Sequence, residues 1–181
     1  GNKYVNIDIN QDIFDEKSLV DQTKIAKKYI LDNFREKGLL INNDTINVTS
    51  RTANEYTHPK NKTSKDVASS KMRASTELDN LLNIAEYSHS DPDDGRHYIA
   101  KDGWDYYKVN FKVGNQTFEG LINVAKNGEN KTLYDITKIK KTSRVGSDNK
   151  STTTNAMSSY DNNITQPKGN VKLSTKYSMQ E

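Results

Sequence analysis

Residues 104–125 read WDYYKVNFKVGNQTFEGLINVA, and the pattern of this stretch indicates a β-hairpin. Apolar and polar residues alternate on both sides of Gly114-Asn115, a pair that tolerates the positive φ of a tight hairpin turn. The alternation predicts two strands, 104–113 and 116–125, each with one face in a core and the other face free. A third strand is expected over 132–139, after the turn around Asn127-Gly128, so that the three strands form an antiparallel meander.

Two amphipathic stretches precede this meander. Apolar residues fall mostly four apart within 18–37, where Ser18 can cap a helix and Gly38 can end it. A second helix is expected over 64–87, stopped by the turn residues of 90–95.

Extended structure is expected at two places before the second helix. Residues 45–51 alternate β-branched with polar side chains, which predicts a half-buried strand, and residues 4–8 also have a strand-like pattern. The order helix, strand, helix and three-strand meander predicts an α+β domain with its helices packed on one face of a small antiparallel sheet.

The composition predicts one core followed by a tail. A chain of 181 residues of which 32% are apolar, with a mean hydropathy of -0.95, holds too few apolar residues for two cores. Apolar residues recur up to about Ile139, whereas 143–181 is rich in Ser, Thr, Asn, Lys and Gln. We therefore expect a globular domain over 1–142 and a polar, flexible tail or inter-module linker over 143–181.

Several classes of function are excluded by what the sequence lacks. It has no cysteine for a disulfide, thiolate metal site or nucleophile, no apolar run that could cross a bilayer, and no signal-peptide core. It also lacks a phosphate-binding Gly-rich loop, a nucleophile elbow and HExxH. Gly1 resembles the residue left by a protease, so we expect a fragment of a longer protein. A net charge of +3 is weak support for a nucleic-acid partner.

Four short motifs carry a resemblance to a known superfamily. They are EYTHP at 55–59, ELDNLL at 77–82, GWDYYKV at 103–109 and LYDI at 133–136. Together they resemble the phage-associated nuclease-like domains of the barnase, EndoU, colicin E5/D and RelE (BECR) superfamily, over about 4–142. Such domains occur in polyvalent proteins of phages and mobile elements, and the tail is similar to the spacers between their modules.

The resemblance implies a small helix-plus-antiparallel-sheet fold and a metal-independent RNase activity that serves as a toxin or effector. It also implies an immunity or antitoxin partner, a cytoplasmic target, delivery with phage or mobile-element DNA, and no cofactor. Cleavage of RNA without a metal needs a base, an acid and cations around the phosphate.

Candidate catalytic residues follow from these needs. His58 suits proton transfer near neutral pH, Arg51 can clamp a phosphate, and Glu55 can act as a base or orient the imidazole. Tyr134 in the last strand can donate through its hydroxyl. The alternatives are a loop histidine before a proline, a surface ion pair and a packed tyrosine.

Candidate substrate-binding residues lie in the basic stretch and on the sheet. Lys71 and Arg73, with Lys60, Lys62 and Lys65, form the most basic stretch and can follow an RNA backbone or be a solvated helix face. Tyr106 and Lys108 fall on the non-core face of their strand, where they can stack on a base and reach a phosphate.

The acidic loop 91–94 lies between His89 and His97 and suggests a metal site. Turn chemistry explains its acids equally well, and the spacing does not match a calcium loop, so we expect no metal.

The sequence thus predicts a metal-independent endoribonuclease-like domain. Two other classes of function remain open. One is a non-catalytic module of a phage or conjugative polyprotein that binds nucleic acid or protein. The other is a purely structural head-associated or packaging domain.

Overall fold

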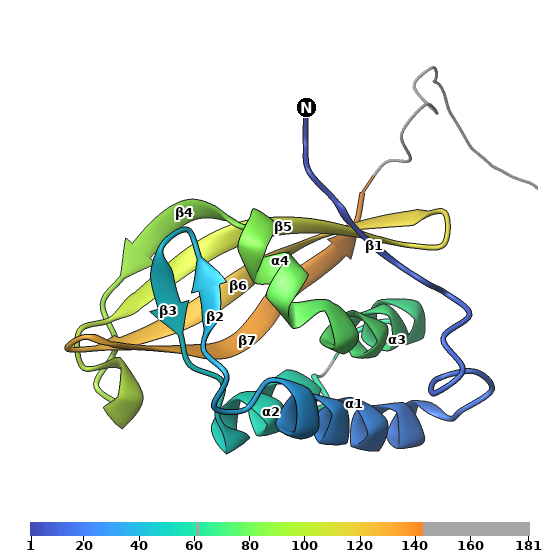
Figure 1. Ribbon diagram of the computed structural model, residues 1–181, viewed down its shortest axis with the longest axis horizontal. Coiled ribbons are helices and arrows are strands. Elements are labelled where there is room, and N and C mark those ends of the chain that lie inside the picture. Colours follow the sequence, from blue (N-terminus) through green and yellow to red (C-terminus); the bar gives the residue numbers. More distant parts are fainter. Residues whose placement is uncertain (61, 143–181) are drawn as a thin grey trace, which may run out of the picture. The chain divides into compact units, whose positions relative to one another are not determined.

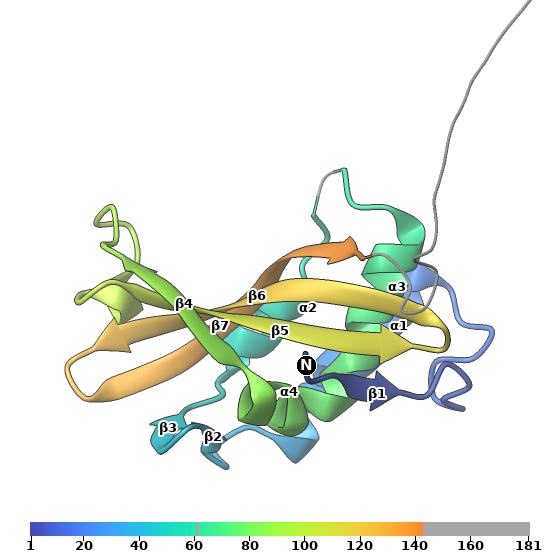
Figure 2. The same cartoon turned by 90° about the horizontal axis from the view of Figure 1, so that it is seen from above.

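The meander forms the centre of the structure. The computed structural model describes residues 1–60 and 62–142. Strands β5 (Trp104–Val113), β6 (Gln116–Asn127) and β7 (Asn130–Lys141) pair antiparallel in sequence order, as predicted. Figure 2 shows them as long, twisted neighbours. Gly114 and Gly128 have φ of 61° and 62° at the two turns, where a left-handed backbone fits the twist of the strands.

The sheet is mixed rather than purely antiparallel, which corrects the prediction. β1 (Val5–Ile7) pairs parallel with one end of β5, with Val5 opposite Phe111. β4 (Glu86–Asp91) pairs antiparallel with the other end of β5, with Tyr87 opposite Tyr107. The strand-like pattern near the N-terminus is therefore confirmed, whereas part of the expected turn at 90–95 belongs to a strand. Both strands hydrogen-bond to backbone groups of β5 that would otherwise form an exposed sheet edge.

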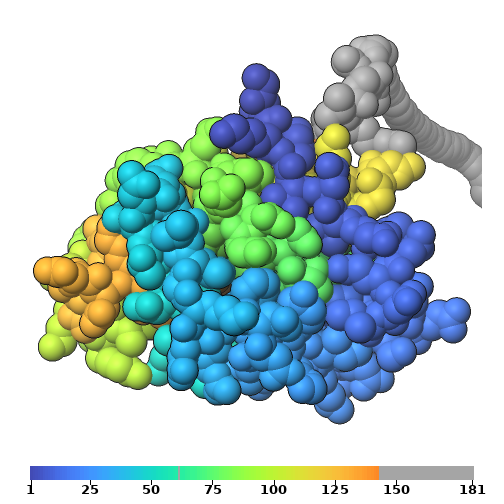
Figure 3. Space-filling view, in the orientation of Figure 1, coloured from blue at the N-terminus to red at the C-terminus, as the bar shows by residue number. Residues whose placement is uncertain are grey.

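The helices lie on one side of this sheet, which confirms the α+β class. In Figure 1, α1 (Leu19–Asn33), α2 (Ser50–Thr57) and α3 (Lys65–Ala74) run below the strands, and α4 (Leu78–Ile84) leads up into β4. Ser18 caps α1 as predicted, because its side chain accepts a hydrogen bond from the backbone N–H of Asp21 (3.1 Å). In Figure 3, α1 and the small β2–β3 hairpin form much of the surface over the core.

The strand expected at 45–51 is wrong beyond its first residues. In the part of the chain that the structure describes, β3 (Asp44–Ile46) pairs with β2 (Leu39–Ile41) in a separate hairpin, and the following Asn47 forms an isolated bridge with Thr132 of β7. The chain then turns into α2 because Thr49 and Thr52 cap the helix reciprocally, each side chain accepting from the other residue's backbone N–H. The Thr52 hydroxyl also donates to the Leu133 carbonyl (2.5 Å), which ties α2 to β7.

The long helix expected over 64–87 is interrupted. A 3-10 turn, η1 (Ser75–Glu77), separates α3 from α4, and the Ser75 hydroxyl donates to the Met72 carbonyl (2.6 Å). Such a bond from a side chain to the preceding turn competes with regular helical bonding. Glu86 and Tyr87 belong to β4, because pairing with β5 supplies hydrogen bonds that a further helical turn would forgo.

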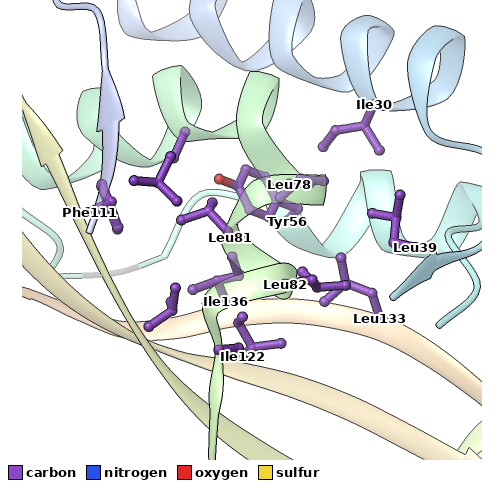
Figure 4. Packing of buried hydrophobic residues seen from close by; sticks show 14 of the residues in the cluster. Ile30, Leu39, Tyr56, Leu78, Leu81, Leu82, Phe111, Ile122, Leu133 and Ile136 are labelled. Carbon is purple, nitrogen blue, oxygen red and sulfur yellow. The ribbon is translucent and has the colours of Figure 1, made fainter. Parts of the chain in front are cut away.

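Apolar residues gather on both faces of the sheet. The main core fills the space between sheet and helices, as Figure 4 shows for side chains including Tyr56, Leu82 and Ile122. A smaller group lies on the opposite face and is called the outer cluster. Its members are Ala100, Trp104 and Ala125, with Ile99, Tyr106 and Tyr134 packed against them.

Residues Gly1–Thr142 form one compact unit. The predicted tail, 143–181, lies outside the described residues. Within the described ranges, no helix combines the length and the apolar character needed to span a bilayer.

Candidate functional site

A bulge in β7 creates the candidate site. The pairing of β6 with β7 shifts register between Asn123 and Val124, opposite Asp135 and Leu133. Tyr134, which falls at this shift, joins the outer cluster, whereas Asp135 is buried against α3 on the helix side. A β-bulge redirects side chains in this way.

Tyr134 lines a cavity of about 480 Å³ on the outer face, called the outer cavity. Its wall consists of Asp91, Pro92, Asp93, Asp94, His97, Trp104, Tyr106, Asn123 and Tyr134. Three rings pack edge to face, with centroid distances of 5.0 Å between Trp104 and Tyr134, 5.2 Å between His97 and Trp104, and 5.6 Å between His97 and Tyr134. These contacts fix the orientation of the imidazole.

Asp93 holds His97 in the wall of the cavity. Its carboxylate lies 2.7 Å from His97 Nδ1 and accepts bonds from the Trp104 indole N–H (2.8 Å) and the backbone N–H groups of Gly95 and His97. Burial favours the neutral carboxyl, but these hydrogen bonds outweigh it and hold the pKa of Asp93 far below its usual range. Because an ionised carboxylate can only accept, His97 Nδ1 carries the proton in this contact, and Nε2 remains available for proton exchange.

The first turns of α2 bring a cation and a carboxylate to the same place. Arg51 and Glu55 are one helical turn apart and pair at 3.9 Å. A hydrogen bond to Tyr98 raises the pKa of Arg51, and the Arg51 guanidinium carbon lies 5.4 Å from the centre of the Tyr98 ring. Partial burial, followed by the charge of Glu55 and a hydrogen bond to it, raises the pKa of Tyr134, whereas Arg51 lowers it. The side chains of Arg51, Glu55 and Tyr134 therefore interact electrostatically with one another.

Tyr106 extends the aromatic surface toward β4. Its ring stacks on His89, with centroids 4.6 Å apart and planes 18° from parallel. Partial burial, then the charges of Asp91 and Asp93, raise the pKa of the Tyr106 hydroxyl. Tyr106 and Lys108 alternate along β5 with the buried Tyr107 and Val109, so both lie on the outer face.

The carboxylates around the cavity have local partners. Asp94 binds Arg96, Asp91 lies 3.5 Å from His89, and Glu55 is paired with Arg51. Potential metal-ligand atoms of Asp93, Asp94 and His97 lie within 4.8 Å of one another. The Asp93 oxygens already accept the four hydrogen bonds described above. Hydrogen bonding within the turn and to the imidazole therefore explains why acidic residues occur in this loop.

The structure separates the predicted catalytic residues into two groups. Arg51, Glu55 and Tyr134 meet beside the outer cavity, together with the predicted substrate-binding residue Tyr106. His58 is instead exposed at the C-cap of α2 and lines two other cavities.

Two of the predicted substrate-binding cations lie away from the outer cavity. Lys71 is buried and paired with Asp135 (2.7 Å). Arg73 is largely buried, 3.9 Å from Asp15 and with its guanidinium carbon 5.8 Å from the centre of the Phe14 ring.

Sequence reasoning considered His97 only as part of an acidic metal loop. The signal that it missed is the spacing of Asp93 and His97 around a turn, followed by Trp104, whose indole N–H needs an acceptor when buried.

The chain matches no protein-family model, no curated protein sequence and no solved structure. The resemblance to the BECR superfamily therefore stays a prediction, and the geometry of the outer cavity has to carry the functional argument.

Proposed function

We propose that the outer cavity is the active site of a metal-independent endoribonuclease-like domain, used as a toxin or effector by a phage or mobile element. One observation carries the proposal: Tyr134 of β7 and the Asp93-His97 pair of the loop after β4 line one cavity, and the Arg51-Glu55 pair of α2 interacts with Tyr134. An open sheet face opposite the helices is also what a BECR-like fold would offer to RNA.

The chemistry divides among these side chains. Transesterification needs a base for the 2′-hydroxyl proton and an acid for the departing 5′-oxygen, and it leaves a 2′,3′-cyclic phosphate. Glu55 is suited to act as the general base that accepts the 2′-hydroxyl proton. His97, oriented by Asp93, is suited to act as the general acid that protonates the 5′-oxygen. Arg51 and the Tyr134 hydroxyl can bind the phosphate oxygens on which charge develops.

The surrounding surface suits a single-stranded substrate. The Tyr106-His89 stack offers a flat platform for an unpaired base, and Lys108 lies on the same face of β5. Two carboxylates near the cavity, Glu55 and Asp94, are paired with the guanidinium groups of Arg51 and Arg96, which reduces the repulsion that an approaching phosphate meets. A toxin of this kind requires an immunity or antitoxin protein that covers the outer cavity until a cytoplasmic target is reached.

The test is cleavage of single-stranded RNA by the intact chain in EDTA, with the cyclic phosphate identified by mass spectrometry. We expect cleavage that His97→Ala and Arg51→Ala each reduce by about 100-fold or more, a usual effect of removing an acid–base or oxyanion group. His58→Ala is the matched histidine control and should retain activity. Loss of activity in His58→Ala with full activity in His97→Ala would return the catalytic role to His58. The absence of cleavage by the unaltered chain would contradict the enzyme.

A non-catalytic nucleic-acid-binding module is the second candidate, and the exposed His89 ring, which stacks on the half-buried Tyr106, favours it. It predicts salt-sensitive RNA binding without any product.

A further inference from the structure

A second cavity lies on the helix side of β7. It has a volume of about 540 Å³, within the range of small-molecule sites, and it is bounded by α1, the end of α2, α3 and the second half of β7. We call it the inner cavity. The outer cavity has no lining residue in common with it.

Most of the inner cavity is apolar. Its aliphatic lining consists of Leu19, Val20, Val67, Ala68, Met72, Ile136 and Ile139. Val20 is 64% exposed although it is a large apolar residue at the cavity's edge. A ligand with a hydrocarbon chain would remove this surface from water.

Two lysines at the inner cavity share one carboxylate. Lys71 and Lys60 both line the cavity, and their ammonium groups lie 2.7 Å and 3.4 Å from the two oxygens of Asp135. Asp135 is 1% exposed and also accepts the backbone N–H of Ile136 (2.7 Å). Among residues 1–60 and 62–142, Asp135 is the sole carboxylate within 4.0 Å of either ammonium. The cluster therefore carries one positive charge in excess.

The Tyr56 hydroxyl is committed to the Lys71 carbonyl (2.5 Å), and the Tyr56 ring faces the ammonium at 4.8 Å. His58 and Lys138 also line the cavity and are cationic or neutral. Burial lowers the pKa of Lys71 and the charge of Lys60 lowers it further, whereas Asp135 raises it. The charge of Glu55 also raises the pKa of Lys71, but Glu55 is itself paired with Arg51 (3.9 Å) and does not line the cavity. An anion beside the two lysines would stabilise both charged forms.

We propose that the inner cavity binds an aliphatic carboxylate, with its chain among the α1, α3 and β7 side chains and its carboxylate on Lys60 and Lys71. Each ammonium has three donors, and Asp135 uses only some of them. A single negative head balances the cluster, and an apolar chain matches the lining. This site is independent of the proposed RNase activity.

Calorimetric titration of the intact chain with octanoate, hexanoate and octanol tests the site. We expect octanoate to bind about tenfold or more tightly than octanol, because the alcohol lacks the charge that the lysines pair. Hexanoate, which is two methylenes shorter, should bind about 15-fold more weakly than octanoate, since each buried methylene contributes about fourfold. Equal affinities for octanol and octanoate, or no binding of octanoate, would overturn the proposal.

Single substitutions distinguish the contribution of the ligand's carboxylate to binding from that of its aliphatic chain. Lys60→Met should weaken octanoate by about tenfold and leave octanol unchanged, whereas Lys37→Met, a matched change at an exposed lysine outside the cavity, should change neither. Ala68→Phe, which fills the cavity from α3, should weaken both ligands. Unchanged octanoate binding in Lys60→Met would place the ligand elsewhere and refute the assignment. Circular dichroism of each variant confirms that it is folded.

Discussion

Tyr134 and Asp135 are consecutive in β7, yet their side chains serve opposite sides of the sheet. Tyr134 packs on Trp104 in the outer cluster, and Asp135 receives Lys71 from α3 on the helix side. In a regular strand, neighbouring side chains always point to opposite faces, so Asp135 and Ile136 could not share one. The register shift next to them breaks this alternation, and both are buried. One bulge therefore contributes to both the outer cavity and the charged cluster of the inner cavity.

Asp135→Asn should strongly destabilise the domain. Lys71 would keep a buried ammonium without its carboxylate, and removing one partner of a buried pair costs about 3–5 kcal/mol. Urea denaturation measures the change. Asp32→Asn is the control, because the Asp32-Lys28 pair is exposed and should be worth less than about 1 kcal/mol. A double change, Lys71→Met with Asp135→Leu, should recover most of the loss, and failure to recover would show that the charge pair is not the cause.

Gly103→Ala should disturb the entry to β5. Gly103 has a φ of 92°, and a Cβ there would stand 2.5 Å from the Asp91 carbonyl oxygen, so the backbone must move. We expect a loss of roughly 1–3 kcal/mol in the free energy of unfolding. Gly128→Ala is matched, since φ is 62° but the space is open. We expect Gly128→Ala to lose less unfolding free energy than Gly103→Ala, and the difference measures the steric contact with the Asp91 carbonyl. Equal losses in the two variants would mean that backbone strain alone causes the effect.

The domain should lose stability in acid partly through Asp105. Burial disfavours its charge, but Ser90 (2.5 Å) and Lys126 (2.9 Å) outweigh this and lower its pKa. An unfolded Asp titrates near about 3.9, so the contribution is complete above that pH and is lost as pH falls through the lower folded-state pKa. Urea denaturation between about pH 5 and pH 2 should therefore show a shallower decline for Asp105→Asn than for the unaltered chain. Asp12→Asn, at an exposed position, should leave the slope unchanged.

Tyr106→Leu should weaken binding of single-stranded RNA by about tenfold, because stacking on one aromatic ring contributes roughly 1–3 kcal/mol per base. Fluorescence anisotropy with a short labelled oligonucleotide measures this. Tyr87→Leu is the control, since Tyr87 is more exposed yet packs on Tyr107 of the main core rather than on the outer cluster. If both substitutions weakened binding equally, the RNA would not bind at the outer face.

Local sequence patterns predicted the meander and the start of α1, although α1 ends at Asn33 rather than near Gly38. Alternation along β5 and β6 and glycines at the turns are local signals, and Ser18 caps α1 within one turn of chain. The strand predicted from the local pattern at 45–51 is wrong beyond its first residues. There the β-branched pattern favours a strand, but the Thr49-Thr52 capping box and the burial of Tyr56 favour a helix. Burial of Tyr56 depends on partners far away in the chain, which a local window does not contain.

The sequence predicted Arg51 and Glu55 as partners of His58, with Tyr134 as a further candidate, whereas long-range packing brings Arg51, Glu55 and Tyr134 together away from His58 and near His97. Their meeting requires α2 to pack on β7, the bulge to turn Tyr134 outward, and the loop after β4 to fold around Asp93. Each of these depends on contacts between residues tens of positions apart. Residue types carry the chemistry, but long-range packing sets the distances between them.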